Sequence, residues 1–273
     1  MNSTEEPMRI ETIGNATLYL GDCLEVMAGL PDASVDMILC DLPYGTTACK
    51  WDTVIPFEPL WAQYRMVAKR NAAIVLTASQ PFTTALIASN MRGFKYEWIW
   101  RKSNGANFTH AKNMPIKFHE NVVVFSDAPI GHHVQLGARR MAYNPQGLRK
   151  VDKVWSRPRK YENGHGLKRE SHKLDRVLEF EGYPTSILDF PNSDNRERGL
   201  HPTQKPVALM EYLIRTYTNE GETVMDNCMG SGTTGVACAN SVRRFIGIER
   251  ERKYFDIACE RIENAQRQRR LSV

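Results

Sequence analysis

The sequence predicts an α/β fold built on a doubly wound, mainly parallel sheet that is interrupted by an inserted basic region. Two observations lead to this prediction. Short apolar runs, typical of buried parallel strands, alternate with stretches of helical periodicity. This alternation stops between about residue 127 and residue 200, where the composition changes, and then resumes.

The first part of the chain contains four expected strands. The apolar runs at 35–40 (VDMILC) and 72–77 (AAIVLT) predict buried strands, each followed by a turn and a helical stretch. Residues 94–101 (FKYEWIWR) alternate aromatic with charged side chains, and residues 121–126 (NVVVFS) contain three consecutive valines, so both predict strands. We expect residues 1–126 to form one half of the sheet domain.

After the interruption, helical apolar stripes and strand patterns alternate again. The expected elements are a helix over 210–217, a strand over 223–226, a helix over 233–239, a strand over 244–249 and a helix over 254–262. Residues 201–273 should therefore complete the domain that residues 1–126 begin.

The inserted region, residues 127–200, carries nearly all of the positive charge. Between residues 139 and 176 there are twelve Lys/Arg and four Asp/Glu, a net +8, which leaves −3 for the remainder because the whole chain is +5. Such a segment suits a phosphate backbone, although a solvated insertion without a partner would look the same. The candidate DNA-binding residues are Arg149, Lys150, Lys153, Arg157, Arg159, Lys160, Lys168 and Arg169.

Composition narrows the class of protein. No apolar run approaches the roughly 20 residues of a membrane helix, and the start of the chain, MNSTEEPMRI, is acidic and polar. We therefore expect a soluble, cytoplasmic protein. Six scattered cysteines without a C-x-x-C pair argue against a zinc site and favour reduced thiols, so we expect no metal.

A glycine turn at residues 224–239 (VMDNCMGSGTTGVACA) indicates a nucleotide site. After a strand ending in Asp226, Gly230 and Gly232 form a turn that a ligand can approach, and Thr233 and Thr234 open a helix. A phosphate-binding P-loop is disfavoured, because it would have Lys followed by Ser or Thr at the positions of Thr233 and Thr234. Gly230, Gly232 and Gly235 match the dinucleotide-binding pattern G-x-G-x-x-G, and a plain tight turn remains an alternative. Glu249, about 20 residues later, suits the ribose hydroxyls of NAD or of any other adenosine-bearing cofactor.

The segment DLPYG, residues 41–45, follows an expected strand, as the glycine turn does. In an open α/β sheet, ligands bind beyond the carboxyl ends of strands where the strand order reverses. Both segments are therefore expected to line one crevice.

Four motifs in order resemble the DNA amino-methyltransferases of the β arrangement. They are DLPYG at 41–45, NFTHAKNMPIKFHENVVVF at 107–125, HPTQKP at 201–206 and DNCMGSGTT at 226–234. In that family the catalytic D/N/S-x-P-Y motif comes first, a target-recognition region follows and the S-adenosylmethionine (AdoMet) motif comes last. The resemblance, from about Thr17 to Ile262, implies a Rossmann-like AdoMet-dependent fold with permuted motif order and makes residues 127–200 the target-recognition region.

This resemblance gives Asp41, Pro43 and Tyr44 catalytic roles. The exocyclic amine of a base is a poor nucleophile because its lone pair is delocalised into the ring. The Asp41 carboxylate and a carbonyl near Leu42 or Pro43 are expected to accept the amine hydrogens and aim the lone pair for in-line displacement. Tyr44 offers a face on which a base flipped out of the duplex can stack.

The resemblance also implies a cofactor site and a base pocket. Asp22 and Cys23 should face the adenine of AdoMet, and Thr203, Gln204 and Lys205 its methionine end, beside Gly230, Gly232, Thr233 and Thr234; Asp226 and Glu249 complete this set. Trp100, Lys102, Asn104 and Asn107 fall near the base pocket and the DNA-facing segment. The chain departs from the family at Asn227 and Cys228, where proline and phenylalanine are common, and at Leu42, where proline is common.

The resemblance favours adenine, because a leading Asp in the catalytic motif usually accompanies adenine N6 methylation in this family. Cytosine N4 methylation is the runner-up. An NAD-dependent oxidoreductase leaves DLPYG and the basic region without a role, and a catalytically silent DNA-binding protein is disfavoured by the intact motif. The expected partner is double-stranded DNA. A homodimer is a further expectation, and a restriction endonuclease partner is left open.

Overall fold

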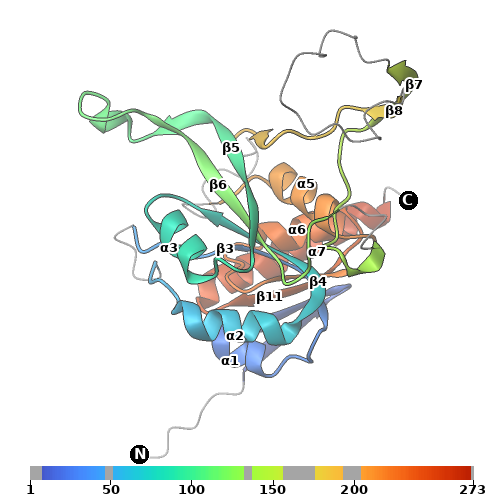
Figure 1. The fold of residues 1–273 in the computed structure, drawn as a ribbon. Coiled ribbons are helices and arrows are strands. Elements are labelled where there is room, and N and C mark those ends of the chain that lie inside the picture. The colour runs from blue at the N-terminus through green and yellow to red at the C-terminus, as the bar shows by residue number, and fades with distance from the viewer. Residues whose placement is uncertain (1–7, 47–51, 132–136, 156–175, 193–203, 272–273) are drawn as a thin grey trace, which may run out of the picture. The chain divides into compact units, whose positions relative to one another are not determined.

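Helices cover both faces of a nine-stranded sheet in the computed structural model, which describes residues 8–46, 52–131, 137–155, 176–192 and 204–271 (Figure 1). The chain forms two compact units, one of Met1–Asn144 with Ser186–Val273 and one of Pro145–Thr185. The larger unit contains the sheet, and the expected α/β fold with a mainly parallel sheet is confirmed.

The strands of the sheet follow each other in the spatial order β1-β2-β11-β10-β3-β4-β6-β5-β9. Their bounds are β1 Arg9–Ile13, β2 Ala16–Leu20, β3 Val35–Asp41, β4 Ala68–Ala78, β5 Phe94–Ala106, β6 Lys117–Phe125, β9 Ile187–Asp189, β10 Thr223–Asp226 and β11 Arg244–Glu249. Antiparallel pairing joins β1 to β2, β4 to β6 and β6 to β5, whereas the other neighbours are parallel.

The helices of this unit are α1 Cys23–Ala28, α2 Phe57–Val67, α3 Phe82–Ser89, α5 Val207–Tyr217, α6 Thr233–Asn240 and α7 Arg252–Leu271, with short 3-10 turns η1 at Phe108–His110 and η2 at Gly137–Arg139. Among the described helices, none combines the length and the apolar character that a membrane span requires.

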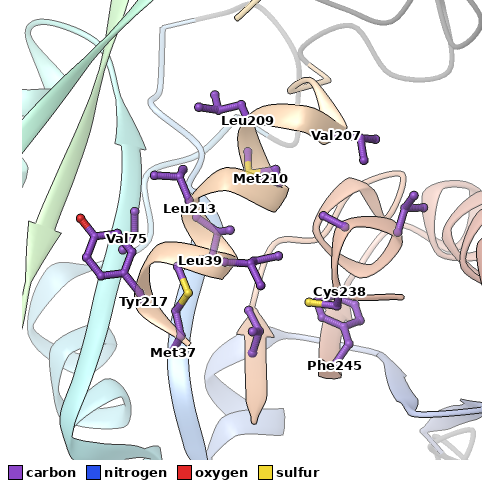
Figure 2. Close-up of a cluster of buried hydrophobic side chains, with 14 of the residues drawn as sticks. Met37, Leu39, Val75, Val207, Leu209, Met210, Leu213, Tyr217, Cys238 and Phe245 are labelled. Atoms are coloured by element: carbon purple, nitrogen blue, oxygen red, sulfur yellow. The ribbon is translucent and has the colours of Figure 1, made fainter. Parts of the chain in front are cut away.

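The buried side chains of β3 alternate between two apolar layers, because successive residues of a strand point to opposite faces. Met37 and Leu39 pack in the layer that α5, α6 and α7 cover (Figure 2). Ile38 and Cys40 pack in the layer of α1, α2 and α3. A strand buried on both faces explains why residues 35–40 read as one continuous apolar run.

The strand order reverses between β3 and β10. These two strands pair in parallel, but the chain leaves β3 for β4 on one side and β10 for β11 on the other. Their carboxyl ends, Asp41 and Asp226, therefore lie beside each other at the topological switch point, where ligands bind in open α/β sheets.

The smaller unit contains an antiparallel pair, β7 Arg149–Trp155 and β8 Arg176–Glu181. The register places Arg149 opposite Glu181 and Trp155 opposite Arg176. Residues 156–175 between the two strands lie outside the described part of the chain.

Candidate active site

A cavity of about 680 Å³ opens at the switch point between β3 and β10. Its volume is in the range of small-molecule sites, roughly 300–1,000 Å³. Of the residues singled out from the sequence, it is lined by Asp22, Cys23, Asp41, Leu42, Pro43, Tyr44, Trp100, Lys102, Gln204, Lys205, Asp226, Asn227, Cys228, Gly230, Thr233, Thr234 and Glu249. One continuous space thus joins the DLPYG segment to the glycine turn.

Three side chains hold the two carboxylate oxygens of Asp41 at the end of β3. Oδ1 accepts hydrogen bonds from the Tyr44 hydroxyl at 2.8 Å and from the hydroxyl of Thr77, which lies opposite Asp41 on β4. Oδ2 accepts from the Lys205 ammonium at 2.6 Å. The orientation of Asp41 is therefore fixed from both sides.

Lys205 is 7% exposed and lies between two carboxylates, Asp41 and Glu120. Its ammonium is 3.5 Å from Glu120 Oε2, and Glu120 also forms an ion pair with Lys102. Burial alone would lower the pKa of Lys205, but the charges of Asp41 and Glu120 outweigh burial and raise it. This ion-pair network thus joins two carboxylates and two ammonium groups.

This network gives one predicted residue, Lys205, an additional contact, and it contains two residues that were not predicted, Thr77 and Glu120. Lys205 was expected beside the methionine end of a cofactor, and in the structure its ammonium also pairs with the Asp41 carboxylate. Thr77 and Glu120 were not singled out from the sequence. Glu120 lies directly opposite Trp100 in the β5–β6 register, but this pairing becomes visible only once both strands are aligned.

The ring of Tyr44 packs against Phe82, with ring centroids 5.1 Å apart and an interplanar angle of 26°. Burial first, and the neighbouring charge of Asp41 second, raise the pKa of the Tyr44 hydroxyl. The hydroxyl therefore stays protonated and donates to Asp41. Phe82 covers one face of the ring, and the Lys205 ammonium lies over the ring, 5.7 Å from its centroid.

Asp226 holds the glycine turn together through hydrogen bonds to its carboxylate. Its carboxylate accepts from Cys228 N at 3.1 Å and from the Thr234 hydroxyl at 2.6 Å. Burial raises the Asp226 pKa to about 6, although these hydrogen bonds act to lower it. Asp226 thus joins the start of the turn to the first residues of α6.

Gly232 does not line the cavity but shapes the turn. It precedes α6 with φ +80°, and a Cβ at this position would lie 2.8 Å from Ala258 Cβ of α7. Both the left-handed backbone and the close approach of α7 therefore require glycine.

Two further carboxylates lie along the cavity. Glu249 Oε2 accepts from Gly230 N at 2.9 Å and Oε1 from Glu251 N at 2.8 Å, and burial raises its pKa. Asp22 caps α1 by accepting from Leu24 N at 2.8 Å. Both side chains therefore hold local backbone in place as well as facing the cavity.

Asn227, one of the departures from the family pattern, is buried and bonded to a second element. The Tyr64 hydroxyl of α2 donates to Asn227 Oδ1 at 2.6 Å. The buried polar side chain at this position therefore has a hydrogen-bond partner on α2.

Two of the residues expected near the base pocket and the DNA-facing segment lie outside the cavity lining. Asn104 N donates to Asn192 Oδ1 at 3.2 Å, Asn107 precedes η1 with φ +65°, and neither lines the cavity. Arg149 forms an ion pair with Glu181 at 3.4 Å, while Lys150 and Lys153 lie on β7. The candidates outside the described residues are Arg157, Arg159, Lys160, Lys168, Arg169 and Thr203.

In the described part of the chain, no group of three or more His, Cys, Asp or Glu side chains is arranged to hold a metal ion.

Known proteins share both the sequence pattern and the fold. A family model described as DNA methylase matches residues 35–260. The DNA adenine methyltransferase YhdJ of Escherichia coli (strain K12) is 27% identical over 265 residues, which cover 91% of this chain and 83% of the relative. The crystal structure of an M1.HpyAVI–SAM complex is 25% identical with a TM-score of 0.58, covering 90% of this chain and 98% of that one.

A second solved structure resembles the chain in fold alone. The PvuII DNA methyltransferase, described as cytosine-N4-specific, is 16% identical with a TM-score of 0.59. The match covers 94% of this chain and 93% of that one.

Proposed function

The chain belongs to the DNA methylase family, and on this basis we propose that it transfers a methyl group from AdoMet to the exocyclic N6 of adenine in double-stranded DNA. The observation that carries the proposal is the single cavity that runs from Asp41 and Tyr44 to the glycine turn. Methyl transfer needs the base and the cofactor in one shared space, because the two reacting atoms must approach in line.

The residues along the cavity fit AdoMet. Glu249 and Asp22 supply carboxylate oxygens, which suit the hydroxyls and the amine of an adenosine group. The turn at Gly230 and the amide of Gln204 suit the methionine end. AdoMet, when bound, supplies an electrophilic methyl group on a sulfonium. The M1.HpyAVI structure, which is that of a SAM complex, adds support.

Asp41 prepares the amine for attack. Its carboxylate accepts hydrogens of the amine, together with a carbonyl of Leu42 or Pro43, so that the nitrogen lone pair is no longer spread into the ring. Tyr44, Thr77 and Lys205 hold the carboxylate in one orientation, which places this acceptor before the base arrives. The same carboxylate is within reach of the proton that the methylated amine must lose.

Adenine is favoured over cytosine by the leading Asp41 and by the Escherichia coli relative, which is named a DNA adenine methyltransferase. The PvuII enzyme has the same fold, so the fold does not discriminate between the two bases. A base paired in a duplex cannot enter this cavity, so the target has to be flipped out, at a cost of a few kcal/mol. We assign target recognition to residues 127–200, through their basic side chains, as the sequence predicts.

The test uses purified protein, AdoMet labelled in its methyl group and unmodified bacterial DNA. We expect label in the DNA and, after hydrolysis to nucleosides, label in N6-methyl-2′-deoxyadenosine. Label in N4-methyl-2′-deoxycytidine would show that the target base is cytosine and not adenine. No transfer to any DNA would overturn the proposal.

A further inference from the structure

We propose that the tip of the β5–β6 hairpin, residues 107–116, enters the DNA duplex beside the target base and fills the space that the base leaves. This inference rests on the proposed function, because only an enzyme that extrudes a base creates such a space. Its occupant is duplex DNA, and a second copy of the chain is the competing occupant.

The hairpin extends beyond the sheet that supports its base (Figure 1). β6 pairs with β4 only over Asn121–Phe125, whereas β5 and β6 continue to pair with each other as far as Ala106 and Lys117. Backbone hydrogen bonds order the tip: His110 N donates to Asn107 O at 2.9 Å and Met114 N to His110 O at 3.0 Å. The tip is thus a hydrogen-bonded turn.

This turn exposes apolar side chains. Phe108 is 73% exposed and Met114 50%, and Ile116 and Phe118 are exposed as well. Gly105 lets the last two lie close across the hairpin, since a Cβ there would be 2.4 Å from Ile116 and 2.7 Å from Phe118. The hairpin therefore exposes apolar side chains both on its flank and at its tip.

The charge of the hairpin points to DNA as the occupant. Residues 101–119 contain four Lys/Arg, two His and no Asp/Glu. Because Arg101 forms an ion pair with Asp189 and Lys102 with Glu120, the net positive charge of this segment comes from Lys112 and Lys117. Lys112 is exposed at the tip itself. An apolar wedge within a basic, acid-free segment matches a phosphate backbone with stacked bases inside it, and proteins insert Phe and Met side chains between base steps in this way.

The position of the hairpin relative to the cavity agrees with this role. Trp100, Lys102 and Ala106 of β5 and Glu120 of β6 line the cavity. A base that has entered the cavity therefore lies against the flank of the hairpin, and its own strand passes close by. The apolar tip belongs to the same hairpin, which puts it in a position to enter the gap in the duplex.

The test compares Phe108→Ala, Phe108→Leu and the control Met91→Ala. Met91 is 63% exposed but precedes β5, at the end of that strand opposite to the tip. After the methylated site has been read by sequencing, two duplexes are used, one with the target base paired and one with the target opposite an abasic position. Methyl transfer, DNA affinity and oligomeric state are measured for each variant.

We expect Phe108→Ala to slow transfer to the paired duplex at least about tenfold, because the wedge offsets an unpairing cost of a few kcal/mol. Transfer to the duplex with the unpaired target should change less than about twofold, since little unpairing is then needed. Phe108→Leu and Met91→Ala should behave like the wild type.

Three results would overturn the inference. Equal losses on both duplexes would show that Phe108 supports the fold or the chemistry. A Phe108→Ala variant that loses a wild-type dimer would assign the tip to a second copy of the chain. If the wild type methylated neither duplex, the proposed methyltransferase function would itself be contradicted, and the inference about the hairpin would fall with it.

Discussion

Asp41 has each carboxylate oxygen held by a different kind of partner, hydroxyls on Oδ1 and the Lys205 ammonium on Oδ2. Hydroxyls alone would orient the carboxylate. The added ammonium also balances its charge in a site that contains a second carboxylate, Glu120. A buried pair of this kind is costly to break, because removing one partner leaves the other charge unpaired.

This pairing leads to a prediction about stability. We expect Lys205→Met to lower the free energy of unfolding by about 2 kcal/mol, less than for a fully buried pair because Asp41 is partly exposed. Combined with Asp41→Asn, it should cost less than the sum of the two single changes, by about 1 kcal/mol or more. Urea unfolding of the four proteins measures this coupling.

The matched control is the exposed pair of Arg267 and Glu263, four residues apart on α7. Its coupling should be about 0.5 kcal/mol or less, because solvent screens it. A coupling at Lys205 and Asp41 as small as that of the control would contradict the account of a charge-balanced site.

Asp226 provides a pH-dependent test. Its pKa is raised by burial from 3.8 to about 6, so the folded protein holds a proton that the unfolded chain releases at a lower pH. The stabilisation from this group is therefore present below about pH 4 and lost as the pH rises through 6. Asp226→Asn has no such titration, and its stability relative to the wild type should rise by about 2.4 kcal/mol between pH 4 and 7.

The measurement is the urea unfolding free energy of both proteins at several pH values across that range. Asp32→Asn, at an exposed site, controls for the loss of one negative charge. A difference between Asp226→Asn and the wild type that stays constant with pH would show that Asp226 ionises in the folded protein as it does in the unfolded chain.

At the scale of elements, the packing of α6 against α7 depends on Gly232. Gly221 has nearly the same backbone angle, φ +78° against +80°, but open space around its Cβ position. Alanine at either site should incur left-handed strain of about 1–2 kcal/mol. Only Gly232→Ala should add an overpacking cost of about 1–3 kcal/mol, because Ala258 lies in the way.

Urea unfolding compares the two variants, and calorimetry measures AdoMet binding to each. Gly232→Ala should also weaken AdoMet binding, since it displaces the turn, whereas Gly221→Ala should leave binding unchanged. If Gly232→Ala and Gly221→Ala lowered the free energy of unfolding equally, α7 would have to shift at no cost to accommodate the added methyl group.

Elements with a strong apolar pattern were predictable from the sequence. The expected strands at 223–226 and 244–249 match β10 and β11 residue for residue, because both are buried and bounded by turns. The hairpin of β1 and β2 was missed, since RIETI and ATLYL are short and half exposed. The expected strand 94–101 ends later, at Ala106, because cross-strand pairing with β6 carries it through polar residues that show no alternation.

At the scale of the whole molecule, motif order predicted which segments meet, but not which side chains pair. DLPYG and the glycine turn were expected to share a crevice, and they line one cavity. The Lys205–Asp41 contact joins residues 164 positions apart and depends on how the segment before α5 returns to the sheet. The contact between Tyr64 and Asn227, 163 positions apart, depends in the same way on tertiary packing.

The basic segment gives a prediction at this scale. Lys150→Glu with Lys153→Glu, both on β7, should weaken DNA binding and reduce the slope of log affinity against log salt by about 2, one unit for each lost phosphate contact. Arg267→Glu with Arg270→Glu on α7 is the control with the same charge change, and its slope should stay unchanged. Equal slopes for all three proteins would place the DNA surface elsewhere.

Asp41→Ala tests whether Asp41 acts on the amine of the target base: methyl transfer is measured with labelled AdoMet, and AdoMet binding is measured by calorimetry on the same preparation. Transfer should fall by at least about 10²-fold, because a preorganised acceptor at the reacting amine is lost. AdoMet affinity should stay within about threefold of the wild type, because the carboxylate contributes to the chemical step and not to ground-state binding. Unchanged transfer, or loss of AdoMet binding together with transfer, would contradict this account.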